Sequence, residues 1–129
     1  MTDTSIKILI VDDFATMRKI IKNLLGKIGY HDVHEVENGQ VALEKLKSCN
    51  FNFIIADWNM PEMNGLDLLK IIRKDEKYKE IPFMMVTAEA NKNFIVAAIQ
   101  AGASDYIIKP FNADTLQEKI KRLFGGQVS

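Results

Sequence analysis

Three acidic residues stand at the ends of apolar runs that have the length of buried strands. Asp12 and Asp13 directly follow Ile6–Val11, and Asp57 directly follows Phe53–Ala56. A carboxylate in such a place is costly when it is buried without a partner. The acids therefore either cap the loops and helices that follow, or take part in chemistry. If only the stretch around Asp57 is considered, capping is the better of these two interpretations.

Two more polar residues follow apolar runs in the second half of the chain. Thr87 follows Pro82–Val86, and Lys109 follows Asp105–Ile108. Each has an ordinary interpretation, because Thr often ends a strand and a lysine at a sheet edge extends its charge into water. Any one of these residues could stand at the end of a strand by chance. Chance is a much poorer explanation for the acids, the threonine and the lysine together. Their joint occurrence favours a functional site.

The elements that would position these side chains alternate along the chain. Short apolar runs predict strands, and apolar residues repeated every three to four positions between them predict amphipathic helices, the last one capped by Asn112. The predicted strands are Ile6–Val11, Val33–Glu37 at an edge, Phe53–Ala56, Pro82–Val86 and Asp105–Ile108. The predicted apolar stripes include Met17, Ile20, Ile21, Leu24, Leu25, Ile28, Leu66, Leu68, Leu69, Ile71, Ile72, Ile95, Ala98, Ile99, Leu116 and Ile120.

This alternation predicts an α/β fold with a parallel sheet covered by helices on both faces. Right-handed crossovers leave few strand orders, and one of them is 2-1-3-4-5, the doubly wound, flavodoxin-like three-layer sandwich. In that order the first and third strands are neighbours where the winding reverses, and ligands bind outside the carboxyl ends of strands at such a point. The acids, Thr87 and Lys109 would then meet at one edge of the sheet.

Such a cluster of carboxylates requires a cation. Two unit charges about 4 Å apart interact by roughly 4 kcal/mol at an effective dielectric near 20. Ligands that are all oxygen, with no His or Cys nearby, favour Mg²⁺, with Mn²⁺ or Ca²⁺ able to substitute. Lys109 adds a charge and Thr87 a hydroxyl suited to a phosphoryl group. Asp57 is then best placed to be the nucleophile that forms an aspartyl phosphate, with Asp12 and Asp13 holding the metal.

Length and composition indicate one globular domain. The chain has 129 residues, 47% of them hydrophobic, and a formal net charge of +0, so we expect no nucleic acid or membrane held by bulk charge. Cys49 is the single cysteine, which suits a reducing, cytoplasmic compartment. We expect neither a signal peptide nor a membrane span. Glycine-rich nucleotide-binding loops are absent, so the donor must carry its own activated phosphoryl group.

The polar motifs resemble the receiver domain of two-component response regulators, and most closely its single-domain chemotaxis members. The segments that carry the resemblance are Asp12-Asp13, Asp57-Trp58-Asn59-Met60-Pro61, Thr87-Ala88-Glu89 and Lys109-Pro110-Phe111. The resemblance covers about residues 6–124, which makes residues 1–129 a single receiver domain by expectation. It implies a signalling phosphoacceptor that catalyses its own phosphorylation and slow dephosphorylation, not an enzyme acting on other substrates.

The resemblance also implies a role for each residue of the site. Asp57 would accept the phosphoryl group from a phosphohistidine of the histidine kinase CheA, or from acetyl phosphate. Mg²⁺ would be surrounded by Asp12, Asp13, Asp57 and the main-chain carbonyl of Asn59. Lys109 would contact the phosphoryl group, and the Lys109–Pro110 peptide bond would be cis.

The same resemblance implies a switch, an output surface and partners. Thr87 would move onto the phosphoryl oxygens and Tyr106 would turn inward behind it, while Asn59 and Glu89 would tune hydrolysis of the aspartyl phosphate. The activated protein, a monomer, would bind the flagellar motor switch protein FliM and alter rotation. The candidate output surface consists of Lys92, Ile95, Tyr106, Ile108 and Lys119.

Other interpretations stay open. A phosphate sink or relay, or a receiver with a non-motor partner, would use the same site. A magnesium-dependent aspartyl phosphatase would need a second acid where Asn59 stands, and a flavin mononucleotide carrier would need a Ser/Thr/Gly-rich loop where Asp12-Asp13-Phe14-Ala15 stands. Asp105 and Gly26 differ from the residues often seen in the family, a small one and a charged one respectively. They leave partner identity open, including whether a CheZ-type phosphatase acts.

Overall fold

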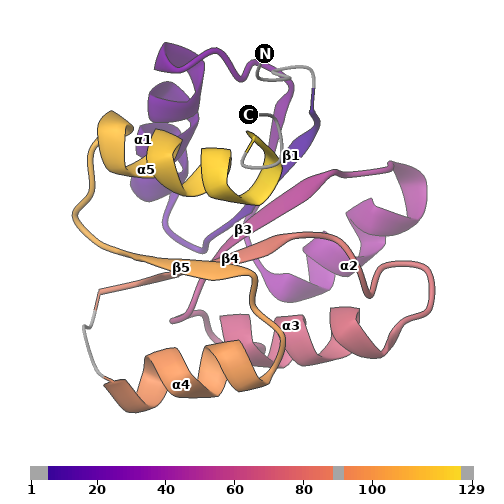
Figure 1. Cartoon of the computed structure of the whole chain (residues 1–129). Coiled ribbons are helices and arrows are strands. Elements are labelled where there is room, and N and C mark those ends of the chain that lie inside the picture. The colour runs from indigo at the N-terminus through magenta and orange to yellow at the C-terminus, as the bar shows by residue number, and fades with distance from the viewer. Residues whose placement is uncertain (1–5, 89–91, 126–129) are drawn as a thin grey trace.

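The computed structural model describes residues 6–88 and 92–125, and in them strands alternate with helices as the sequence predicts (Figure 1). The strands are β1 (Ile8–Val11), β2 (Val33–Val36), β3 (Phe53–Asp57), β4 (Phe83–Thr87) and β5 (Asp105–Ile108). The helices are α1 (Ala15–Lys27), α2 (Gly39–Ser48), α3 (Gly65–Lys74), α4 (Lys92–Gln100) and α5 (Ala113–Ile120), and a π-helical turn, η1 (Lys121–Gly125), follows α5.

The strands form one parallel sheet with the order β2-β1-β3-β4-β5. This is the order that the sequence predicts, with β2 at one edge and β5 at the other. The winding reverses between β1 and β3, whose register pairs Val11 with Ala56. The residues that follow this pair, Asp12 and Asp57, therefore lie side by side at the end of the sheet.

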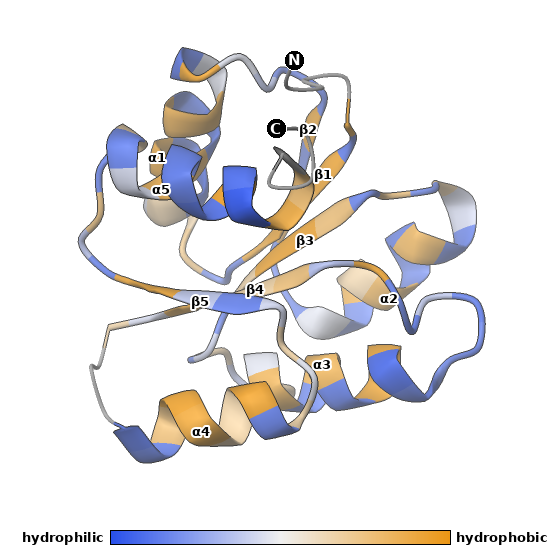
Figure 2. Ribbon diagram, in the orientation of Figure 1, coloured by the Kyte–Doolittle hydropathy of each residue, from blue (hydrophilic) through white to orange (hydrophobic). Residues whose placement is uncertain are grey.

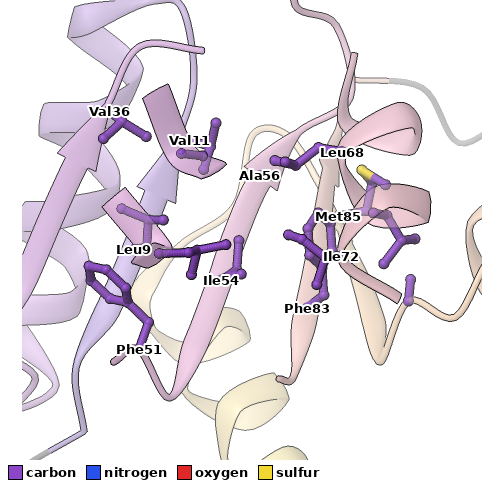
Figure 3. Packing of buried hydrophobic residues seen from close by; sticks show 14 of the residues in the cluster. Leu9, Val11, Val36, Phe51, Ile54, Ala56, Leu68, Ile72, Phe83 and Met85 are labelled. Atoms are coloured by element: carbon purple, nitrogen blue, oxygen red, sulfur yellow. The ribbon is translucent and has the colours of Figure 1, made fainter. Parts of the chain in front are cut away.

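Helices cover both faces of the sheet, with α1 and α5 on one side and α2, α3 and α4 on the other (Figure 1). Side chains alternate between the faces along each strand. Leu9 and Ile54 pack toward the side of α2 and α3 (Figure 3), whereas Ile8 and Ile55 pack toward α1 and α5. Both faces of the central strands are fully buried, which explains why these strands are nearly continuous apolar runs in the sequence.

Three residues of the predicted apolar stripes are exposed, and their assignment to the core is wrong. Ile20 is 45%, Ile71 41% and Ile99 49% exposed. A helix on a sheet buries a limited stripe, and successive residues are rotated by about 100° around its axis. The neighbouring Ile21 and Ile72, which also belong to the predicted stripes, are buried as expected. Figure 2 shows that hydrophobic residues make up much of α4, so apolar character alone did not define its buried face.

Element boundaries differ from the prediction at the site itself. Asp57 and Thr87 are the last residues of β3 and β4, not the first residues after them. Asn112 caps α5 as predicted, since its side chain accepts a hydrogen bond from the backbone N–H of Thr115 at 2.9 Å. The polar edge of the sheet is thus part of the hydrogen-bonded ladder, which limits how far the backbones of Asp57 and Thr87 can move but does not itself restrain their side chains.

Candidate functional site

The three acids meet at the carboxyl edge of β1 and β3. Asp12, Asp13 and Asp57 each offer a carboxylate oxygen, and these oxygens lie within 4.8 Å of one another. The predicted gathering of the acids is confirmed. Asp13 does not cap α1, because the N-cap residue is Phe14 and no side chain caps that helix. The capping interpretation of this acid is therefore wrong.

Burial distinguishes the three acids. Asp12 is 1% and Asp57 5% exposed, whereas Asp13 is exposed to solvent. The backbone N–H of Phe14 donates to Asp12 Oδ1 at 2.9 Å and fixes the orientation of that carboxylate. Asp12 Oδ2 and Asp57 Oδ1 are buried and accept no hydrogen bond among the described residues. Buried polar atoms normally have partners, so the donor set fits a cation bound between the acids.

The protonation of the buried acids points the same way. The pKa of Asp12 is raised to about 6, and burial is the largest cause; the N–H of Phe14 opposes the rise and the charge of Asp57 adds to it. Burial also raises the pKa of Asp57, against the lowering effect of Lys109. The ionised form of each carboxylate is therefore energetically unfavourable in the folded chain. A divalent cation removes much of this cost, because opposite charge nearby favours the ionised form.

Lys109 and Thr87 complete the site at the same edge. The Lys109 ammonium nitrogen lies 3.1 Å from Asp57 Oδ1 as an ion pair outside hydrogen-bond geometry. Its backbone N–H donates to the carbonyl of Thr87 at 2.8 Å, which ties the loop after β5 to the end of β4. Thr87 is 4% exposed. The Lys109–Pro110 peptide bond is cis, as the resemblance implies.

Gly65 forms a wall of the site that the sequence prediction missed. A Cβ built on Gly65 would lie 2.5 Å from the carbonyl oxygen of Asp57 and 2.7 Å from Met85 Sδ. The Gly65 N–H donates to the carbonyl of Trp58 at 2.9 Å. The start of α3 thus presses against the backbone of Asp57, at a distance that only glycine permits. Asn64-Gly65 was visible in the sequence only as the start of a helix.

The remaining predicted residues lie around this centre. Asn59 is exposed, and Trp58 is half-buried with its ring stacked on Phe94 of α4 at 5.1 Å between centroids. Glu89 lies outside the described residues. On the candidate output surface Lys92 is exposed, and Ile95, Tyr106, Ile108 and Lys119 are half-buried.

The fold and the arrangement of polar residues define a receiver. A family model described as response regulator receiver domain matches residues 8–121, and the chain belongs to this family. Receivers of this kind are themselves a standard example of the rule that ligands bind at the switch point of the sheet. The acids of this chain lie at that switch point, between β1 and β3.

Two curated relatives place the chain among chemotaxis response regulators of two-component systems. It is similar to chemotaxis protein CheY-3 of Vibrio cholerae, with 52% identity over 120 residues, 93% of this chain and 92% of the relative. It is also similar to chemotaxis protein CheY of Pseudomonas aeruginosa, with 53% identity over 118 residues, 92% of this chain and 95% of the relative.

Solved structures agree with the fold. The crystal structure of Vibrio cholerae chemotaxis protein CheY4 at low pH covers 93% of this chain, and this chain covers 99% of it, with a TM-score of 0.86 and 33% identity. The signal receiver domain of a histidine kinase from Syntrophus aciditrophicus has a TM-score of 0.85 and 32% identity, covering 95% of this chain and 92% of its own. Within the described residues no helix has the length and apolar character that crossing a membrane requires.

Proposed function

We propose that this receiver takes a phosphoryl group onto Asp57 from a phosphohistidine of a CheA-like histidine kinase, in a reaction that depends on Mg²⁺. In the phosphorylated state it binds the flagellar motor switch protein FliM and alters rotation. The observation that carries the proposal is the meeting of three carboxylates, two of them buried, with the Lys109 ammonium 3.1 Å from Asp57 Oδ1. The similarity to chemotaxis proteins of Vibrio cholerae and Pseudomonas aeruginosa supports the cellular setting.

The chemistry follows from the side chains. A carboxylate oxygen of Asp57 attacks the phosphorus, an O–P bond forms and the N–P bond to the histidine breaks, leaving the imidazole to take up a proton. Lys109 supplies positive charge where the phosphoryl oxygens gather negative charge. Hydrolysis of the aspartyl phosphate returns the carboxylate and releases phosphate.

A divalent cation would be held by Asp12, Asp13, Asp57 and, by family resemblance, the main-chain carbonyl of Asn59. When bound, it neutralises charge on the acids and on the incoming phosphoryl group. All of these ligands are oxygens, which suits Mg²⁺ and allows Mn²⁺ to substitute. Asn59 and Glu89 are proposed to tune hydrolysis, as in the family.

The switch is proposed to run from β4 to β5. Phosphorylation adds about −1.5 to −2 charges and strong acceptor oxygens, toward which the Thr87 hydroxyl moves. Tyr106 lies on the adjacent edge strand, where it pairs in register with Met85, two residues before Thr87. To change the ratio of the inactive to the active conformation from about 99:1 to about 1:99, phosphorylation has to stabilise the active one by roughly 5.5 kcal/mol more than the inactive one. The new Thr87 and Lys109 contacts to a charged group are the proposed source.

Incubation with Mg²⁺ and acetyl phosphate tests the proposed chemistry. Intact mass spectrometry is expected to show one phosphoryl adduct in the native chain and none in Asp57→Asn. Asp114→Asn, an exposed acid in the first turn of α5, is the matched control and keeps the adduct. An adduct of the same yield in Asp57→Asn contradicts the assignment.

The departures in the sequence support a second candidate, a receiver that stores phosphoryl groups or regulates a non-motor partner. Asp105 stands beside Tyr106 on the candidate output surface and adds a negative charge there. Purified FliM captured on beads distinguishes the two. Retention of the chain that appears only with acetyl phosphate and fails in Asp57→Asn supports motor output. No retention in any sample supports the second candidate, whereas equal retention in all samples contradicts the proposed dependence of motor binding on phosphorylation.

A further inference from the structure

The Lys119 side chain of α5 contacts two consecutive residues of the edge strand β5, Asp105 and Tyr106. The Lys119 ammonium lies 3.3 Å from Asp105 Oδ1 and 4.5 Å from the centroid of the Tyr106 ring. Asp105 Oδ1 also accepts the backbone N–H of Tyr106 at 2.7 Å. A cation within about 6 Å of an aromatic centroid is attracted to the ring. The charge of Lys119 is therefore shared between a carboxylate and the ring of Tyr106.

This ion pair is better shielded from water than a second ion pair on the same helical segment. The side chains of Lys119 and Asp105 are 17% and 16% exposed. The Glu118–Arg122 pair on the same helical segment is 69% and 65% exposed, with 3.5 Å between the charged atoms. Exposed pairs are weakened by solvent and salt, whereas partly buried pairs are screened much less. The Asp105–Lys119 pair can therefore keep the Lys119 ammonium in place, whereas the Glu118–Arg122 pair cannot fix its side chains in the same way.

The shielded pair lies where the output switch has to move. Tyr106 and Lys119 line the same surface groove of about 570 Å³, which continues along Ile108 and Phe111. A Tyr106 ring that turns inward toward Thr87 has to leave the Lys119 ammonium. As long as Asp105 holds Lys119, the half-buried Tyr106 ring keeps a favourable contact in the position that it has here, beside the Lys119 ammonium.

We infer that Asp105 and Lys119 form a latch that holds the Tyr106 ring beside the Lys119 ammonium in the unphosphorylated protein and keeps the Lys119 charge from partners. This inference rests on the proposed function, because it assigns Asp105 as a positioning residue for the proposed output switch. Removing the Asp105 charge frees Lys119 to leave the ring. The ring then samples the inward position without phosphorylation.

Nuclear magnetic resonance of the unphosphorylated protein tests the latch directly. The ε-methylene protons of Lys119 carry a ring-current shift from Tyr106, and Tyr106→Leu gives their position without the ring. In Asp105→Asn, which keeps the shape of the side chain, this shift is expected to fall by about half or more. Asp105→Glu restores part of it, and Glu118→Gln, on the exposed pair, leaves it unchanged.

Lys119→Gln removes the positive charge of the same ion pair. It provides a second test of the latch if Asp105→Asn does not fold. The ring resonances of Tyr106 are expected to move in the same direction in both variants. A ring-current shift in Asp105→Asn equal to that of the native chain, or Tyr106 resonances that stay in place in Lys119→Gln, would overturn the latch.

The same samples separate the latch from the proposed function. After Mg²⁺ and acetyl phosphate, the native chain is expected to gain the phosphoryl adduct and to lose ring-current shift at Lys119. A missing adduct counts against the proposed function, while the measurements on unphosphorylated protein still decide the latch. An adduct together with a shift that Asp105→Asn does not change overturns the latch alone.

Discussion

Asp12 carries the strongest electrostatic cost in the site. Its carboxylate is 1% exposed, one of its oxygens accepts no hydrogen bond among the described residues, and its pKa is raised from 3.8 to about 6. The rise has burial as its largest cause, so it reflects the position of the residue at the end of a buried strand. An acid kept under these conditions is expected to hold a cation, and the folded state without one should be sensitive to pH.

We expect the metal-free protein to lose stability as pH rises from about 4 to about 7. Because the pKa of Asp12 is higher in the folded state, the native chain binds the proton more tightly, and folding is favoured while Asp12 is protonated. A pKa raised from 3.8 to about 6 corresponds to at most roughly 3 kcal/mol, and the raised pKa of Asp57 acts in the same direction. Urea unfolding in a chelator at several pH values measures the effect.

Asp12→Asn is the comparison that isolates this residue. The variant should be more stable than the native metal-free chain at neutral pH. The difference should shrink toward pH 4, where Asp12 is protonated in the folded chain and partly protonated in the unfolded chain. Asp114→Asn should follow the native curve. A gap between native chain and Asp12→Asn that is the same at pH 4 and pH 7 would contradict the pKa assignment.

At the scale of the elements, the start of α3 sets the backbone of β3. Gly65→Ala places a methyl group 2.5 Å from the Asp57 carbonyl oxygen and 2.7 Å from Met85 Sδ. Overpacking of a filled site costs about 1–3 kcal/mol. We expect a loss of stability of that size, together with slower phosphorylation by acetyl phosphate, because the Asp57 backbone has to shift.

Gly26→Ala is the matched control for this change. It lies within α1, and the nearest atom to its new Cβ is His31 Nδ1 at 4.0 Å. Alanine in a helix is favoured over glycine by about 0.5–1 kcal/mol, so this variant should be slightly more stable. Denaturant unfolding and the phosphorylation rate distinguish the pair. Equal stability of the two variants would show that the wall at Gly65 is not rigid.

A second contact between elements is made by Arg73 at the end of α3. Its guanidinium donates to the carbonyls of Gly102 at 2.9 Å, Lys79 at 3.1 Å and Ile81 at 2.8 Å. It therefore joins the loop before β4 to the loop before β5. Arg73→Met leaves these carbonyls without donors, each buried unsatisfied group costing about 1–3 kcal/mol.

Since two of the three carbonyls are near solvent, we expect a total loss of about 2 kcal/mol for Arg73→Met in urea unfolding. The neighbouring Lys74→Met, on an exposed residue, should change stability by less than about 0.5 kcal/mol. A loss no larger than that of Lys74→Met would show that water replaces the guanidinium at little cost.

At the scale of the whole molecule, the sequence predicted the strand order and the meeting of the acids, because both depend on patterns local to each strand. The apolar runs mark buried strands, and right-handed crossovers leave few ways to arrange them. The wall at Gly65 and the Arg73 contacts depend on residues distant in sequence, and no local pattern marks them. The burial of Ile20, Ile71 and Ile99 was predicted wrongly for a similar reason, since the rotation of a helix is set by the sheet below it.

Metal binding should stabilise the molecule as a whole, because the acids of β1 and β3 come together only in the folded chain. A ligand at 100 times its dissociation constant adds roughly 2.7 kcal/mol to the unfolding free energy when it binds only the folded state. We therefore expect Mg²⁺ to raise the urea midpoint at neutral pH and to change the fluorescence of Trp58, the single tryptophan, which follows Asp57 directly.

Asp13→Asn separates a specific site from general salt effects. Asp13 is exposed, so its replacement should cost little stability without metal while weakening both responses to Mg²⁺. Asp114→Asn should keep both responses, and an equal ionic strength of sodium chloride should produce neither. If Asp13→Asn responds to Mg²⁺ at the same concentrations as the native chain, the three acids do not share one ion. The proposal that they prepare Asp57 for phosphoryl transfer then fails, since an unneutralised cluster would repel the phosphoryl group that it has to accept.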